Sequence, residues 1–384
     1  MNSYVNLLRS WVQTGQDMFS GYSEGGKKAA VKIDKAAVIY NAREFDNSHL
    51  DTSKCIRTLT QLVYLFNRGE YFSEEEGTKL FFAISKLLQT EEPSLRRIVY
   101  VGIKEMRKHP SIYVFTSSLT KDLHHKNHNF RRNSVRSIPL IVDPVNLSQF
   151  ERYIKELIVD PDQGVCSAAL LSGMQIYQSN EELVKKWGSE ILEKINAKDQ
   201  YVQCHALMLI GDIKRKDPLA HRKILFSLTK QPFEGLAAVQ YLRMLGQAAA
   251  ALDSDEPEIK EFTNYLSRTI RHKDDMVQIE ACRLARECSL VANQELLEVV
   301  KMLETFLASA STVKKYAMLK IFNSLLRNQY RKNLIVNVKE IEKVLNGSNT
   351  SLSAIAATIL LRICSENYLE TLLGRIEKIM IDMS

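Results

Sequence analysis

Three groups of residues in this chain have types and spacings that could support chemistry, and the first is a glycine–lysine segment near the N-terminus. Gly21, Gly26 and Lys27 in GYSEGGKK match the G-x-x-x-x-G-K spacing of a phosphate-binding loop. Position 28 is a lysine, where such a loop needs a hydroxyl to hold magnesium. No strand pattern precedes the segment. We therefore interpret it as a flexible basic turn and expect no nucleotide cofactor.

The second group is a histidine cluster, His124, His125 and His128, in the segment HHKNHN. Histidines at this spacing can hold a metal ion when further ligands complete the set. Asp122 is the one additional ligand type nearby, and the surrounding residues are those of a polar turn between helices. We expect a turn here and no metal site.

The third group consists of thiols and one further histidine. None of the six cysteines forms a CxxC pair, and His205 lies beside Cys204. Small cysteines within a helical pattern are typical of core residues in a reducing compartment. No Ser–His–Asp or Cys–His arrangement and no recognisable carboxylate pair stands out. We expect no catalytic residues and no enzymatic activity.

Composition and charge favour a folded helical protein that binds other surfaces. The 384 residues are 45% hydrophobic and 25% charged, with only eight prolines and fifteen glycines. The net charge of +7 suits an acidic partner or an anionic membrane face. The basic runs at 131–132 and 214–216 lack interleaved aromatic residues, so nucleic acid is not expected. No 18-residue apolar stretch or signal-peptide pattern is present, which predicts a cytoplasmic protein.

A recurring signature sets the fold. About every 35 to 40 residues a polar turn is followed by an apolar residue and, four positions later, often by a small one, which is the spacing of helical repeat arrays. The first apolar residues are Leu95, Phe130, Val165, Val202, Val277, Val313 and Leu352. The small residues that follow them include Ala169, Ala206, Ala281, Ala317 and Ala356. Because i and i+4 share a helix face, a small residue there lets two helices approach closely. We predict an all-α protein, a right-handed α-solenoid of HEAT/armadillo-like repeats.

Helix boundary signals agree with this pattern. Asp51 or Ser53 is suited to begin one helix, and Gly69 to end it. Ser73 and Glu76 have the spacing of a capping box, and Pro93 suits the first turn of the following helix. No segment alternates with a period of two, so strands are not expected.

The chain is expected to divide into two parts. Residues 1–28 form an N-terminal extension, either disordered or a short amphipathic helix that covers the first repeat or lies at a membrane interface. Residues 29–384 form one continuous solenoid trunk. Its final repeat has no polar cap, so Ile355, Ile359, Leu360, Ile363 and Leu372 are expected to lose their cover.

Two neighbouring segments carry more apolar residues than one core face needs. On a helical wheel the inner stripe is formed by Leu95, Val99, Gly102, Ile103 and Met106. Ile98 lies at the edge of this stripe and Val101 outside it. In the next segment Tyr113 and Val114 project away from the inner residues. These spare residues could merge into an exposed patch that binds a partner, or a neighbouring segment could cover them.

The same residues carry a resemblance to a known family. The run AREFDNSHLDTSKCIRTLTQLVYLFNRGEYFSEEEGTKLFFAISKLLQ, with LRRIVYVGIKEM and VFTSSLTKD, resembles the N-terminal adaptin-like trunk of coatomer gamma subunits. QFERYIKELIVD, CSAALLSG and QCHALMLIGDIKRKDPLA agree with it in the same order. The resemblance covers about residues 35 to 384, is strongest at 41–225, and fades at 232–260 and 330–384.

The resemblance implies a non-catalytic subunit of the COPI vesicle coat that acts in retrograde Golgi-to-ER and intra-Golgi protein transport. It implies peripheral recruitment to Golgi membrane and COPI vesicles by a GTP-bound Arf-type GTPase. It further implies pairing with a zeta subunit and contact with the beta and delta subunits. Matched through LRRIVYV and YVFTSSLTKD, the candidate GTPase-binding residues are Ile98, Val101, Tyr113 and Thr116.

Two further expectations follow from this comparison. Family members continue well beyond this point, so we expect a trunk truncated at its C-terminal end. A general HEAT-repeat scaffold, such as a transport receptor or a clathrin-adaptor large subunit, is the alternative; it accounts for the repeats but not for the ordered gamma-like segments.

Overall fold

The computed structural model describes residues 33–47, 49–252, 257–287, 293–309, 311–326, 338–347, 349–363 and 366–383. Within these ranges the chain is helical, with short turns between helices and no strand. The predicted extension 1–28 and its glycine–lysine segment lie outside the described residues. The contacts gather the chain into two compact units that meet in sequence at Phe150 and Glu151.

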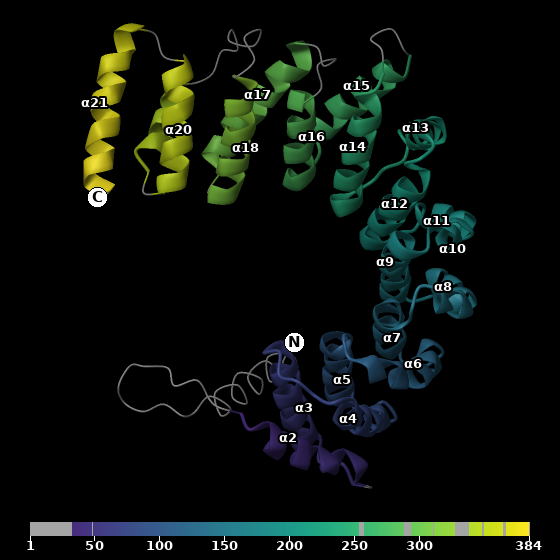
Figure 1. Ribbon diagram of the computed structural model, residues 1–384. Coiled ribbons are helices and arrows are strands. Elements are labelled where there is room, and N and C mark those ends of the chain that lie inside the picture. The colour runs from purple at the N-terminus through teal and green to yellow at the C-terminus, as the bar shows by residue number, and fades with distance from the viewer. Residues whose placement is uncertain are drawn as a thin grey trace. The chain divides into compact units, whose positions relative to one another are not determined.

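The first unit consists of helices packed in two layers (Figure 1). Its second layer is formed by α3 (Thr52–Asn67), α5 (Pro93–Met106) and α7 (His128–Ile141), which pack in succession. The other elements are α2 (Lys35–Asn41), η1 (Ala42–Asp46), α4 (Glu74–Leu87), η2 (Pro110–Phe115), α6 (Thr116–Leu123) and η3 (Asn146–Phe150). Of these, α4 packs between η1 and η2, and α6 packs on α7, which makes them the first layer.

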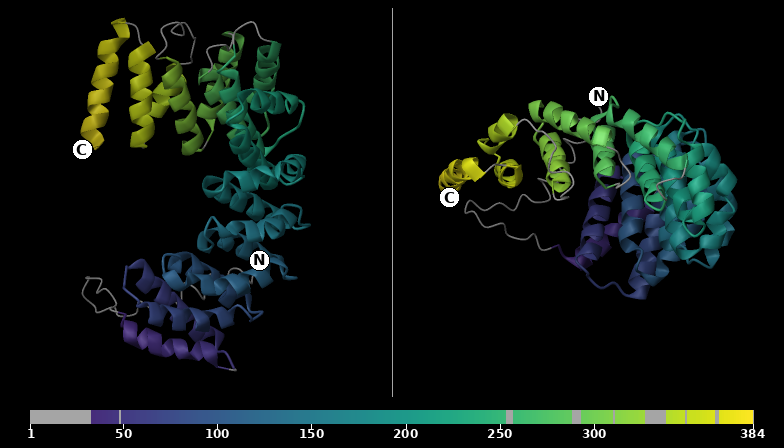
Figure 2. Two further views of the ribbon diagram at one scale, coloured as in Figure 1. Left: turned by 45° about the vertical axis from the view of Figure 1, so that its right-hand side comes forward. Right: turned by 90° about the horizontal axis from the view of Figure 1, so that it is seen from above.

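The second unit repeats this plan. Its second layer is formed by α9 (Gln163–Ser179), α12 (Gln200–Lys214), α14 (Gly235–Ala249), α16 (Asp275–Glu287), α18 (Thr312–Leu325) and α20 (Thr350–Ile363). The first layer is formed by α8 (Glu151–Ile158), α10 (Glu181–Lys185), α11 (Gly188–Lys194), α13 (Pro218–Ser227), α15 (Pro257–Ile270), α17 (Asn293–Ala308) and α19 (Val338–Leu345), and α21 (Glu366–Met383) follows α20. Each second-layer helix packs on the next, as Figures 1 and 2 show for α14 to α20.

Burial confirms the predicted repeat signature. In the second-layer helices from α5 onward, the third residue is buried in all but one. The residue four positions after it is buried in all of them. The buried third residues are Leu95, Phe130, Val165, Val202, Ala237, Val277 and Leu352. The helix α14 is a repeat member that the sequence pattern missed, because alanine and tyrosine replace the expected residues at Ala237 and Tyr241.

The exception is α18, where the predicted register is wrong by one residue. Val313 is 76% exposed and Ala317 is only half-buried, whereas Met318 is fully buried. The helix begins at Thr312, so Lys314 occupies the third position and its ammonium pairs with Asp275 of α16. The aliphatic part of a lysine side chain can pack against apolar residues while its ammonium reaches an acidic partner. Lys314 can therefore take the place of the apolar residue, and the helices still pack as in the other repeats.

The helix boundary signals act as predicted in the first unit. The Asp51 carboxylate accepts hydrogen bonds from the backbone N–H groups of Ser53 and Lys54. Ser73 and Glu76 form the reciprocal capping box. Pro93 occupies the first turn of α5. Gly69 has φ +76°, a left-handed conformation that a glycine adopts without strain and that ends the run of α3.

Near the C-terminal end the expectation of uncovered apolar residues is wrong for Ile359, Leu360 and Leu372. All three are fully buried, and α20 packs on α18, α19 and α21. Ile355 and Ile363 are half-buried.

The four described cysteines, Cys55, Cys166, Cys204 and Cys282, are buried free thiols, as predicted. Burial raises the pKa of the Cys166 thiol to about 11 and that of Cys282 to about 12. These side chains are therefore neutral packing residues. Cys288 and Cys364 lie outside the described residues.

The corrected register gives a matched pair of substitutions in neighbouring repeats. Ala281→Glu places a carboxylate at a fully buried position between helices, which costs about 3 kcal/mol or more. Ala317→Glu places it at a half-buried position and is expected to cost much less. The midpoints of urea unfolding, followed by circular dichroism, compare the two. Equal midpoints would show that the register assigned to α18 is incorrect.

Candidate docking surfaces

Val101 is an exposed apolar residue on the outer face of α5. Its side chain is 45% exposed, while Val99 and Met106 on the opposite side of the helix are buried. Arg97 and Lys104 are also exposed, and at i−4 and i+3 they lie on the same helix face as Val101. A short apolar spot flanked by two cations is suited to a partner with an apolar contact and acidic edges.

Ile98 does not belong to this surface, which corrects the expectation from the helical wheel. Its side chain is only 5% exposed. Gly102, four residues further on, faces Val63 of α3, since a Cβ added at Gly102 would lie 3.6 Å from a Val63 methyl. Ile98 shares that helix face, so the contact between α3 and α5 covers it.

Tyr113 and Thr116 come from the first layer. Tyr113 is 65% exposed on η2, and Thr116 is half-buried at the start of α6. The segment η2 packs on α4, where Ser111 Oγ lies 2.7 Å from Thr78 Oγ1 and the rings of Phe115 and Phe81 are 5.5 Å apart. Val101 and Tyr113 therefore belong to different layers, and the buried Ile98 does not connect them.

Phe82, which no sequence pattern singled out, is 54% exposed on α4, next to the element that carries Tyr113. An aromatic residue beside the buried Phe81 reads in sequence as a second core residue. The first layer therefore offers two exposed aromatic side chains on adjacent elements, a common composition at protein interfaces.

A buried charge cluster fixes α5 against α6 and α7, and no sequence pattern indicated it. Arg96 and Asp122 are 2% and 4% exposed, and Arg96 Nη2 lies 2.6 Å from Asp122 Oδ1. The Tyr100 hydroxyl accepts a hydrogen bond from Arg96 at 2.8 Å and donates one to Asp122 Oδ2 at 2.7 Å. The Arg96 guanidinium also lies 4.1 Å from the centroid of the Phe130 ring.

The electrostatics of this cluster favour a fixed geometry. Burial raises the pKa of the Asp122 carboxyl, and the hydrogen bonds from Tyr100 and Arg96 oppose that rise. Burial also raises the pKa of the Tyr100 phenol, so the hydroxyl stays protonated and can donate. Because each charge has a partner at hydrogen-bonding distance, the helix that carries Val101 is held in one orientation against α6 and α7.

The histidine cluster is a turn, as predicted. His124 ends α6, and α7 begins at His128. Both ring nitrogens of His125 have partners, the Glu91 carboxylate at 3.1 Å and the backbone N–H of Asn127 at 3.0 Å. Across the described ranges, no group of His, Cys, Asp and Glu residues could hold a metal ion.

His205 is a partly buried packing residue in α12. Its Nδ1 lies 3.0 Å from the Ser167 hydroxyl of α9, so the pair joins two neighbouring second-layer helices. The sequence pattern placed His205 within the helix but did not indicate this partner.

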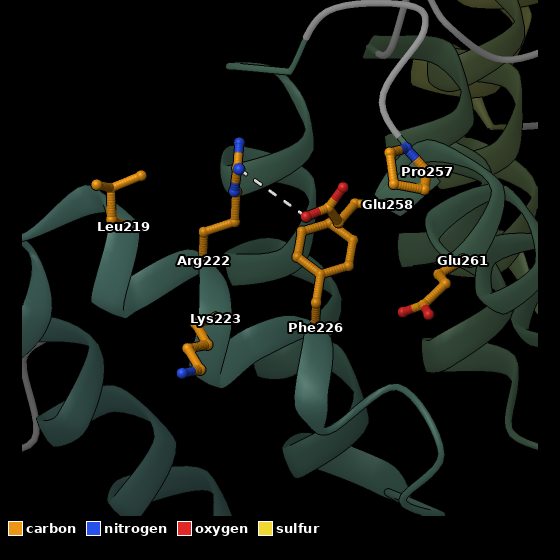
Figure 3. Close-up of a pocket in the computed structure, with 7 residues that line it drawn as sticks. All are labelled: Leu219, Arg222, Lys223, Phe226, Pro257, Glu258 and Glu261. Atoms are coloured by element: carbon orange, nitrogen blue, oxygen red, sulfur yellow. Dashed lines mark ion pairs between the residues drawn. The ribbon is translucent and has the colours of Figure 1, made fainter.

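A groove lies between the first-layer helices α13 and α15 of the second unit (Figure 3). Its volume is about 470 Å³, and Leu219, Phe226 and Pro257 provide its apolar lining. Arg222 of α13 and Glu258 of α15 face each other at 3.8 Å. The sequence does not indicate this groove, because the nearest lining residues of its two walls, Phe226 and Pro257, are 31 residues apart.

These features define the class of the protein: a two-layer array of helical repeats whose exposed side chains are suited to binding other macromolecules. Residues 35–384 match the family described as the Adaptin N terminal region, and the chain belongs to that family. Adaptin and coatomer proteins form a non-catalytic family of coat proteins, and this chain is likewise not an enzyme.

The chain is similar to coatomer gamma subunits. It is 34% identical over 359 residues to coatomer subunit gamma-1 of Oryza sativa subsp. japonica, covering 92% of this chain and 40% of that protein. The coatomer subunit gamma of Arabidopsis thaliana is 34% identical over 355 residues, with the same coverage. Coatomer subunit gamma-1 of Homo sapiens is 31% identical over 364 residues, covering 94% of this chain and 41% of that protein.

The chain thus spans about 40% of the length of these relatives. Among structures, a chain described as a homology model of the full-length AP-3 complex in an intermediate open conformation aligns with a TM-score of 0.53. It covers 99% of this chain and 68% of its own length at 12% identity, which supports the adaptin trunk fold.

Within the part of the chain that the structure describes, no helix has the length and apolar character needed to span a bilayer.

The buried charge cluster yields a second matched pair of substitutions. Asp122→Asn leaves the Arg96 cation buried without its anion and is expected to cost about 3–5 kcal/mol. Tyr100→Phe removes a hydroxyl but keeps the ion pair, with an expected cost of about 1–2 kcal/mol. Urea unfolding measures both. A milder effect for Asp122→Asn than for Tyr100→Phe would contradict the assigned role of the ion pair.

Proposed function

We propose that this chain is the trunk of a COPI coat subunit that a GTP-bound Arf-type GTPase recruits to Golgi membrane for retrograde Golgi-to-ER and intra-Golgi transport. The similarity to coatomer gamma subunits over more than nine-tenths of the chain supports this assignment. In this role the protein works at the cytoplasmic face of the Golgi and on COPI vesicles, as a peripheral protein.

The observation that carries the GTPase proposal is the exposure of Val101 between Arg97 and Lys104. An apolar side chain exposed on a rigid helix loses little conformational entropy when a partner covers it. The flanking cations favour a partner with acidic edges and accelerate its association. Tyr113 and Thr116 provide a separate contact from the first layer. Ile98 is buried where α5 packs on α3 and takes no part in the contact.

We further propose that the chain pairs with a coatomer zeta subunit and contacts the beta and delta subunits. The support is the resemblance to gamma subunits. Surface binding is also the kind of chemistry that an array of helical repeats provides.

Substitution of Val101 tests the GTPase proposal. Val101→Asp places a charge in a small apolar contact and is expected to weaken binding of the GTP-loaded GTPase by at least about tenfold. Val145→Asp is the matched control, since Val145 is 84% exposed elsewhere in the same unit. Pull-down and calorimetry with GTP-loaded and GDP-loaded protein give the readout. Tyr113→Asp tests the first-layer contact separately.

Ile98→Asp is unsuitable for this test, because a charge at a buried position is expected to unfold the unit rather than remove a contact. Equal binding of the two nucleotide states, or equal affinity of Val101→Asp and Val145→Asp, would refute the proposed contact.

Partner pairing predicts a stability shift. A zeta subunit that binds only the folded chain stabilises it by mass action, by about 2.7 kcal/mol at a hundred times the dissociation constant. The melting temperature is therefore expected to rise steadily with zeta concentration. A melting curve that excess zeta leaves unchanged would count against the coat assignment.

A further inference from the structure

Four consecutive second-layer helices of the second unit expose an apolar side chain at the same position. The second residue of α12, α14, α16 and α18 is Tyr201, Leu236, Met276 and Val313, respectively. These side chains are 50%, 36%, 42% and 76% exposed. Because the four helices pack in succession and in the same register, the four residues form one row across them, here called the apolar row.

The equivalent position in the other second-layer helices is small or polar. It holds Ser53, Ser94, Asn129, Gly164 and Ser351. The apolar run from α12 to α18 is therefore a local property of these four helices and not a general feature of the repeat.

A second line of residues extends the apolar row toward the helix centres. Three positions further along the same four helices are Cys204, Val239, Ile279 and Tyr316. The first two are buried, Ile279 is half-buried and Tyr316 is 40% exposed. The exposed row therefore continues into an apolar floor, as in the centre of a protein interface.

A basic row borders this band on one side. Seven positions after the apolar row, α14, α16 and α18 carry Arg243, Arg283 and Lys320. Glu280 accepts hydrogen bonds from Arg243 at 2.9 Å and from Arg283 at 3.0 Å. Arg283 also pairs with Glu287, so the three cations of the row have two carboxylates beside them and keep a net positive charge. On the other side charges of both signs occur, as in the pair of Lys273 with Glu234 at 2.6 Å.

We propose that the apolar row binds an amphipathic helix of a partner protein that is apolar along one side and acidic along the flank facing the basic row. Packed helices lie about 8–10 Å apart, and a helix rises about 1.5 Å per residue. A helix lying across the row therefore meets a new second-layer helix about every five to seven residues. Contact with all four requires about 17 to 21 residues, with acidic side chains directed at Arg243, Arg283 and Lys320.

This inference is independent of the proposed GTPase contact, because the apolar row lies in the second unit and Val101 lies in the first. Failure of one leaves the other intact. The charge asymmetry favours an acidic helix over a second copy of this chain, whose net charge is +7.

The test uses the full chain and a fluorescein-labelled helical peptide of about 21 residues, with leucine about every seven residues and glutamate along one flank. Fluorescence anisotropy gives its dissociation constant. Met276→Asp and Val313→Asp are each expected to weaken binding at least about tenfold, and Lys320→Glu to weaken it less. Leu219→Asp is the matched control, because Leu219 is 73% exposed in the first layer of the same unit.

A peptide with lysine in place of glutamate provides the charge control and is expected to bind more weakly. Thermal melting checks that each variant keeps its fold. Binding that Met276→Asp and Val313→Asp leave unchanged would overturn the proposal, as would equal affinity for the lysine peptide. Sedimentation that shows a dimer of this chain disrupted by Val313→Asp would assign the row to a second copy instead.

Discussion

Close approach between successive second-layer helices is the constraint on which the rest of the structure depends. A helix pair of this kind has an apolar face that only its neighbours can cover. The helices meet where side chains are small, as at the fully buried Ala169, Ala206 and Ala281. A Cβ on Gly246 of α14 would lie only 2.1 Å from a methyl of Leu284 in α16. Close contacts of this kind fix the rotation of each second-layer helix about its own axis. That rotation decides which of its residues face outward.

Both units add buried charge to this apolar packing. In the first unit Arg96 and Asp122 join α5 to α6, and in the second Glu280 joins α14 to α16 through Arg243. Such pairs contribute little net stability when compared with well-packed apolar residues, because desolvation offsets their attraction. They do penalise any register that separates the partners. We infer that they define which helices meet and in what orientation, while the apolar residues supply the free energy of folding.

The sequence was sufficient for the fold class, the repeat period and most helix boundaries, because capping residues and helical periodicity act over a few positions. Asp51, Ser73 and Pro93 are examples. It was insufficient wherever burial depends on a neighbour. Ile98 reads as peripheral on its own helix but is covered by α3. Leu360 reads as uncovered, but it is buried in a helix that packs on α18, α19 and α21. The register of α18 could not be predicted, because the residue that pairs with Lys314, Asp275, is 39 residues away in the sequence. The Arg96 cluster and the groove at Arg222 were missed for the same reason.

The four buried thiols have a consequence for studies of how the array opens. Cys55, Cys166, Cys204 and Cys282 lie in α3, α9, α12 and α16, one in each of four repeats. A thiol reagent reacts with the thiolate, so a buried cysteine with a raised pKa is modified only after its helix separates from its neighbours. The chain thus carries natural reporters at four places along its length. The order in which a pulse of alkylating reagent marks them gives the sequence in which the repeats come apart, without any introduced label.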